Sequence, residues 1–187
     1  MNNPRLAGRY AKSLLDLAIE QNQLDTVYAD MKFLLSVSNS NPDFVAILKS
    51  PVIATEKKEK LIESITKGRV SEMTGLFISL LMRKTRESNL PQMVKAFIEQ
   101  YNKLNNIHPV KITTAVPMSN ELRESIIAKI KTNPELQKIE LQEVVKEELI
   151  GGFRLEVGDL LVDASIARDL HDVKKQFLSN EYIHKLR

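Results

Sequence analysis

The spacing of apolar residues changes once along the chain, and this change constrains the fold more than any other feature. Through most of the first 105 residues, apolar side chains recur every three or four positions, as on one face of a helix. From 110 to 116 they alternate with polar residues between Pro109 and Pro117, a period-two pattern typical of a strand. We therefore predict a helical domain at 1–105 and a mixed domain at 109–187.

Six helices are expected in the first domain. Asn3-Pro4 provides an N-cap followed by proline at the first helical position, and later breaks occur at Asn41-Pro42 and Ser50-Pro51. Because the connections are short, the six helices should form an all-α bundle. The expected helices cover residues 4–21, 24–37, 42–48, 56–66, 71–85 and 91–104.

The second domain is expected to be a small α+β unit with a short β-sheet, which gives the whole chain an α+β class. Further strands are predicted at 139–146 and 153–157, and Gly158-Asp159 should form a two-residue hairpin into 160–162. Two helices complete this domain. One follows Ser119 and carries Leu122, Ile126, Ile127 and Ile130, and the last carries Ile166, Leu170, Val173 and Phe177 on one stripe.

Composition excludes several kinds of function. The chain has no cysteine, so it has no disulfide and no thiol nucleophile. Its three histidines are not spaced as metal ligands, and it lacks phosphate-binding glycine loops and a nucleophile elbow. The net charge of +3 is not concentrated in one basic segment, and no apolar run approaches membrane-spanning length. We expect no catalytic residue, cofactor, metal, nucleic acid or membrane span.

The pair Gly151-Gly152 is the remaining glycine feature. It precedes an expected strand at 153–157, so it lacks the helix N-terminus that would bind phosphate. We interpret it as a bend at which a second backbone approaches closely.

Two helices are more apolar than a surface helix requires. A core-facing stripe is usually little more than about 100° wide. Apolar residues span roughly 220° of the first helix and roughly 240° of the fifth, at about 100° per residue. Both helices could lie at the centre of the bundle, or part of each surface could be a groove for an amphipathic helix of another protein. Periodicity alone does not decide between these readings.

Two motifs resemble one family. Residues 6–14 read Leu-Ala-Gly-Arg-Tyr-Ala-Lys-Ser-Leu, and residues 149–159 read Leu-Ile-Gly-Gly-Phe-Arg-Leu-Glu-Val-Gly-Asp, continuing at 162–166 with Val-Asp-Ala-Ser-Ile. These resemble the opening and C-terminal motifs of the delta-subunit family of bacterial F-type ATP synthases, whose mitochondrial counterpart is the oligomycin-sensitivity-conferring protein. Length and order of elements agree over essentially the whole chain.

The resemblance implies a static role. Such subunits join the alpha3beta3 catalytic head to the b subunits of the peripheral stalk, so that the head resists rotary torque during proton-driven ATP synthesis. The helical bundle would receive the N-terminal helix of the alpha subunit between helices one and five, and the second domain would bind the C-terminal region of b. The protein would lie at the cytoplasmic face of the bacterial inner membrane, attached only through its partners.

The resemblance also assigns residues. The expected groove residues are Leu6, Tyr10, Leu14, Leu76 and Leu80, whereas Gly151, Gly152, Gly158 and Asp163 are expected to be structural members of the C-terminal motif.

The chain departs from the family pattern in two places. Thr85 stands where the family often has glycine, with Arg83 in place of an acidic residue, and Ala164 stands where glycine is usual. Two other functional classes stay open: a helical RNA-binding or antitermination-type module, which would need a basic patch, and a small-molecule enzyme, which would need a pocket with convergent ionisable groups.

Overall fold

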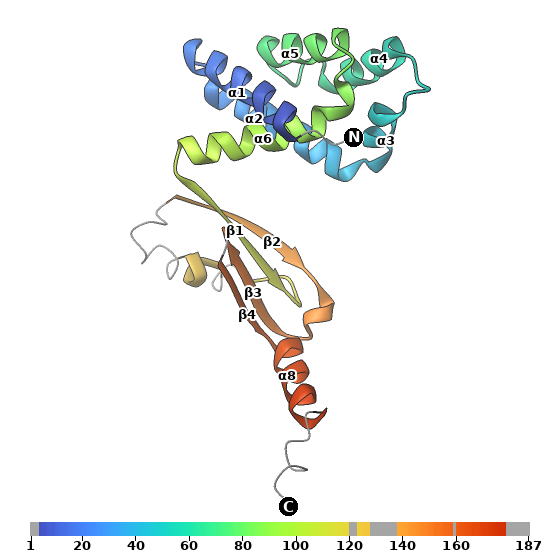
Figure 1. The fold of residues 1–187 in the computed structure, drawn as a ribbon. Coiled ribbons are helices and arrows are strands. Elements are labelled where there is room, and N and C mark those ends of the chain that lie inside the picture. The colour runs from blue at the N-terminus through green and yellow to red at the C-terminus, as the bar shows by residue number, and fades with distance from the viewer. Residues whose placement is uncertain (1–3, 120–122, 128–137, 159, 179–187) are drawn as a thin grey trace, which may run out of the picture. The chain divides into compact units, whose positions relative to one another are not determined.

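The computed structural model describes residues 4–119, 123–127, 138–158 and 160–178. Contacts divide the chain into two compact units, unit 1 at Met1–Leu104 and unit 2 at Asn105–Arg187. Unit 1 is helical and unit 2 combines a sheet with helices (Figure 1), which confirms the predicted α+β class.

Unit 1 is a helical bundle whose six described α-helices match the six predicted from the sequence. Helix α6 packs against α1 and α2, and the side chains buried there include Met31, Leu34, Met93 and Phe97. The helices are α1 Pro4–Glu20, α2 Leu24–Ser40, α3 Pro42–Lys49, α4 Thr55–Thr66, α5 Glu72–Arg83 and α6 Leu90–Leu104, with a short 3-10 helix η1 at Glu87–Asn89.

Helix α5 ends two residues earlier than the pattern predicts. Thr85 adopts φ of 53°, and its amide donates to the Met82 carbonyl while the Arg86 amide donates to the Leu81 carbonyl. These two bonds form a Schellman motif, in which the left-handed position normally holds glycine. The departure from the family pattern at Thr85 therefore places a β-branched residue in a strained backbone conformation.

Unit 2 contains a four-stranded sheet in the order β2-β1-β3-β4. Strand β1 pairs parallel with β2 and antiparallel with β3, and β3 forms the predicted hairpin with β4, Val157 pairing with Leu160. Val110 and Ile112 of the central strand are fully buried. The elements are β1 Ile107–Thr114, β2 Lys138–Val145, η2 Glu147–Leu149, β3 Gly152–Val157, β4 Leu160–Ser165 and α8 Ile166–Leu178.

The start of β1 differs from the prediction. The alternating pattern predicts a strand only from residue 110, but β1 begins at Ile107 and includes Pro109. Proline is tolerated there because β1 pairs at that point with β2, whereas its pairing with β3 begins at Val110. The strand therefore begins three residues before the alternating pattern that predicts it.

The helix expected after Ser119 is described in part. Residues 123–127, which include Ile126 and Ile127, are helical, and the Arg123 amide donates to the Ser119 carbonyl at 3.0 Å. Leu122, Ile130 and Asp159 lie outside the described residues.

Candidate functional site

A groove of about 590 Å³ lies between α1 and α5. Apolar side chains recur along both walls at helical spacing, and polar side chains also line the groove. From α1 and the turn after it the lining residues are Tyr10, Ser13, Leu14, Leu17, Gln21 and Gln23, and from α5 they are Glu72, Met73, Leu76, Phe77 and Leu80.

Four of the five predicted groove residues line this groove together. Leu76 and Leu80 are the most open of them, with 66% and 45% of their surface exposed, and Tyr10 is partly buried. Leu14 is only 3% exposed and forms part of the floor. Leu6 is half-buried and is not among the lining residues.

Sequence reasoning missed three apolar members of the groove. Leu17, 41% exposed, belongs to the broad apolar surface of α1, and Met73 and Phe77 belong to that of α5. Their apolar character was visible in the sequence, but only the position of α1 relative to α5 shows which side of each helix opens into the groove.

The lining of the groove is mostly apolar. Its ionisable side chains are Tyr10 and Glu72, and the remaining members are aliphatic, aromatic, hydroxyl or amide groups. Among the described residues, no group of three His, Cys, Asp or Glu side chains could hold a metal ion. A groove whose lining is mostly apolar is suited to the apolar face of an amphipathic helix.

The four residues of the C-terminal motif belong to the β3–β4 hairpin and its two ends, with Asp163 paired to Arg154 within it. Gly152 has φ of 74°, and a Cβ atom there would lie 2.1 Å from the Ala164 carbonyl oxygen on β4. At Gly151 the nearest atom to such a Cβ would be the flexible tip of Ile166, at 2.7 Å. Gly158 has φ of 56°, the positive value that the hairpin turn requires. No atom lies near the place where its Cβ would be.

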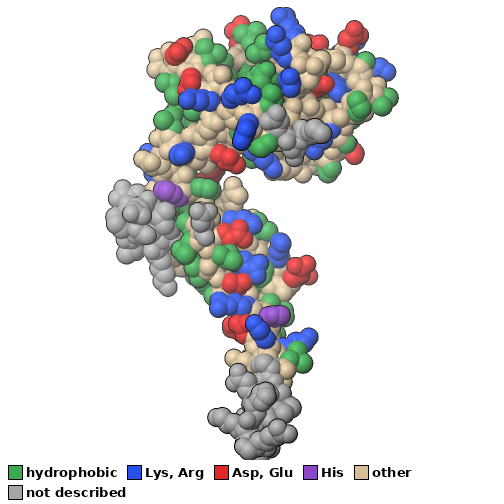
Figure 2. Space-filling model, viewed as in Figure 1, with side chains coloured by type: hydrophobic (Ala, Val, Ile, Leu, Met, Phe, Trp, Pro, Cys, Tyr) green, Lys and Arg blue, Asp and Glu red, His purple; other side chains and the backbone are tan. Residues whose placement is uncertain are grey.

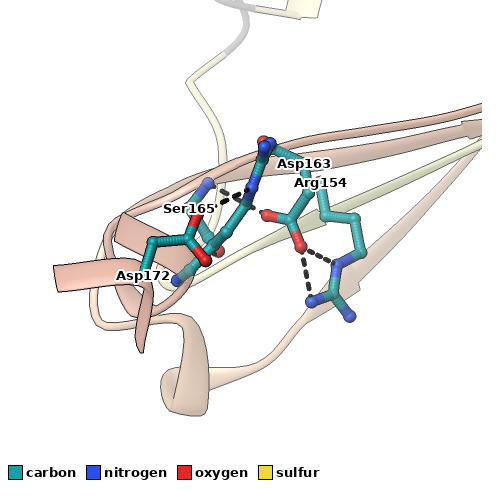
Figure 3. Close-up of polar contacts among 5 residues, drawn as sticks. Arg154, Asp163, Ser165 and Asp172 are labelled. Carbon is teal, nitrogen blue, oxygen red and sulfur yellow. Dashed lines mark hydrogen bonds and ion pairs between the residues drawn. The ribbon is translucent and has the colours of Figure 1, made fainter. Parts of the chain in front are cut away.

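Asp163 organises the junction between β4 and α8. Its carboxylate accepts from Arg154 Nε at 2.8 Å and Nη2 at 2.7 Å across the hairpin, and from the Ser165 amide at 3.1 Å (Figure 3). The Ser165 hydroxyl in turn accepts from the Arg168 amide in the first turn of α8. Hydrogen bonding from Ser165, followed by Arg154, holds the pKa of the Asp163 carboxyl below its ordinary value.

Unit 2 also exposes an apolar surface. Ile166, Leu170, Val173 and Phe177, the predicted stripe of α8, are 46–82% exposed. The start of α8 contacts β4 and η2, and the helix continues beyond the end of the sheet (Figure 1). Leu160, Leu161 and Val162 of the edge strand β4 are exposed as well.

Basic and acidic side chains both occur on the face of the protein that Figure 2 shows. No described helix is both long and apolar enough to cross a bilayer.

Comparisons with known proteins agree over nearly the whole chain. A family model described as ATP synthase delta (OSCP) subunit matches residues 6–177. The ATP synthase subunit delta of Cytophaga hutchinsonii is 36% identical over 177 residues, which cover 95% of this chain and 96% of that protein. The subunit delta of Christiangramia forsetii is 35% identical over 188 residues, covering 100% of both.

One solved structure shares the fold. A chain of the Toxoplasma gondii mitochondrial ATP synthase hexamer aligns with a TM-score of 0.70 and 22% identity, covering 93% of this chain and 98% of that one.

Proposed function

Because the chain belongs to the ATP synthase delta (OSCP) subunit family, we propose that it is a non-catalytic stator subunit of an F-type ATP synthase. It links the alpha3beta3 head to the b subunits of the peripheral stalk, so that the head resists torque while the central shaft turns. Such a role needs slow dissociation from both partners rather than side-chain chemistry. The observation that carries the proposal is the open apolar groove between α1 and α5.

The groove is the docking site for the head. The N-terminal helix of the alpha subunit places its apolar side chains against Tyr10, Leu76 and Leu80, above a floor that includes Leu14. Leu76 and Leu80 are exposed in the free subunit, and burial of such side chains supplies the binding free energy. Because the walls are helices of a packed bundle, little ordering of the groove is needed on binding.

The stalk is bound by unit 2. The exposed stripe of α8 presents an apolar surface of the kind that marks protein interfaces, and Leu160, Leu161 and Val162 of the edge strand β4 are exposed as well. The C-terminal region of the b subunit covers this surface. The subunit is thereby held at the cytoplasmic face of the inner membrane through its partners.

Two rival classes are less well supported by the groove lining and by the surface that Figure 2 shows. An RNA-binding module needs a continuous basic patch, whereas the face shown in Figure 2 carries both basic and acidic groups. A small-molecule enzyme needs convergent ionisable groups, and the groove offers only Tyr10 and Glu72.

The experiment uses membranes that lack this subunit and adds the purified chain back. Subunits that co-purify after solubilisation are identified, and proton-driven ATP synthesis is measured. Leu76→Asp should lose the head while retaining the b subunits, and Leu170→Asp should show the reverse. Both side chains are more than half exposed, so neither variant should unfold. If both variants retain both partners, the proposal is wrong.

A further inference from the structure

Helix α5 forms one wall of the groove but is held in place from its other sides. It packs against α2, α4 and η1, and the groove separates it from α1. The width of the groove therefore depends on how α5 is fixed to the rest of the bundle. Buried polar groups lie at both ends of this helix.

At the start of α5, one carboxylate oxygen collects three hydrogen bonds. Asp30 Oδ2, on α2, accepts from the Ser71 amide at 2.8 Å, the Ser71 hydroxyl at 2.6 Å and the Thr74 hydroxyl at 2.7 Å. Asp30 is 6% exposed and Thr74 is fully buried. Ser71 is the N-cap residue of α5, so a buried negative charge stands at the positive end of the helix dipole.

These bonds fix the part of α5 that opens into the groove. Glu72 and Met73, both lining residues, follow the anchored Ser71 directly. Without the Asp30 carboxylate, one amide and two hydroxyl donors would lose their acceptor in a water-poor environment. The start of α5 would then have to shift, or admit water, to satisfy them.

A second buried group lies just beyond the other end of α5. Lys58 Nζ, on α4, donates to Glu87 Oε1 at 2.9 Å and to the Leu48 carbonyl, at the end of α3, at 3.1 Å. The two charged side chains are 5% and 8% exposed. This ion pair fixes η1, which follows α5 after its Schellman turn, to α3 and α4.

We propose that Asp30 and the Lys58–Glu87 pair are positioning residues that hold α5 at the separation from α1 required by the docked helix. The inference rests on the proposed function. None of the three side chains lines the groove, so they act on affinity through α5. Fixing α5 in advance reduces the ordering that docking would otherwise require.

The test measures binding of a synthetic peptide copying the N-terminal helix of the alpha subunit to the full chain. Asp30→Ala removes the shared acceptor and should weaken binding of the peptide at least tenfold. Asp30→Asn retains an acceptor oxygen and should recover part of that loss. Glu87→Gln should weaken binding less than Asp30→Ala, because Lys58 keeps its bond to the Leu48 carbonyl.

A core variant of α2, the helix that carries Asp30, provides the matched control. Leu34→Ala creates a cavity one turn after Asp30 and should lower the melting temperature without removing a hydrogen bond to α5. All titrations are run well below every melting transition. Leu34→Ala leaves the hydrogen bonds of Asp30 to Ser71 and Thr74 in place, so its affinity for the peptide should stay within about twofold of that of wild type.

Hydrogen exchange gives a second measurement. The amides of α5 should exchange faster in Asp30→Ala than in Leu34→Ala. Wild-type affinity in Asp30→Ala, or equal losses in Asp30→Ala and Leu34→Ala, would overturn the inference alone. Failure of the wild-type chain to bind the peptide would overturn the proposed function, and this inference with it.

Discussion

Alanine substitution of the three motif glycines should separate backbone strain from close packing. Gly152 and Gly158 both have positive φ, but only Gly152 has a backbone atom in the space where a Cβ would lie. A left-handed conformation costs an L-residue roughly 1–2 kcal/mol. Gly158→Ala should therefore lower the free energy of unfolding by about that amount and no more.

At Gly152 a steric contribution adds to the backbone strain. A Cβ atom 2.1 Å from the Ala164 carbonyl oxygen cannot be accommodated without moving β4, and overpacking of this kind costs typically 1–3 kcal/mol. The total for Gly152→Ala is then roughly 2–5 kcal/mol. Gly151→Ala meets only the tip of Ile166, which can rotate away, and should be the mildest of the three.

Scanning calorimetry of the full chain measures this series. A change of 1 kcal/mol shifts the melting temperature of a small domain by roughly 4–8 °C, so Gly152→Ala should lower the transition of unit 2 by at least about 8 °C. Gly158→Ala is the matched control for φ. Equal shifts for Gly152→Ala and Gly158→Ala would refute the role assigned to the close approach of β4.

Three further outcomes are expected. Thr85→Gly should raise the free energy of unfolding by about 0.5–1 kcal/mol in denaturant titrations, because glycine relieves the strain at φ of 53°; a loss of stability would contradict the assigned Schellman motif. Burial, with a hydrogen bond to Asp25, raises the pKa of Tyr101 to about 12. The free energy of unfolding should therefore fall as pH rises from about 10 to 12. Tyr101→Phe should remove that part of the fall, measured as the change of melting temperature with pH. Limited proteolysis should release a folded fragment of residues 1–105, and cooperative loss of both units after cleavage near the linker would show that they do not fold independently.

The fold class was predictable because it depends on local periodicity. Helical spacing before residue 105 and alternation after it are properties of neighbouring residues, and the helix ends carried ordinary breakers such as Asn41-Pro42. The start of β1 was missed because Pro109 argues against a strand. The strand tolerates Pro109 because the pairing with β3 begins only at Val110, and this pairing is a property of the assembled sheet.

The candidate site was predictable only at the level of helices. Periodicity showed that α1 and α5 are too apolar for one stripe, but Leu14 and Leu76 look alike in the sequence although one is buried and the other exposed. The anchors of α5 gave no signal, because Asp30 and Ser71 are 41 residues apart. Nor did the pattern show that the stripe of α8 stays open, since an apolar stripe usually predicts burial.

Isothermal titration of the alpha N-terminal peptide into wild type and Leu76→Asp tests the central claim, that the groove is the docking site. About two-thirds of the Leu76 surface is available for burial, worth roughly 1–2 kcal/mol, and desolvating an aspartate adds a further penalty. Binding should therefore weaken by roughly 100-fold or more, with a melting temperature near that of wild type. Val52→Asp, at a 90% exposed position outside the groove, should bind normally. Wild-type affinity in Leu76→Asp would place the docking site elsewhere.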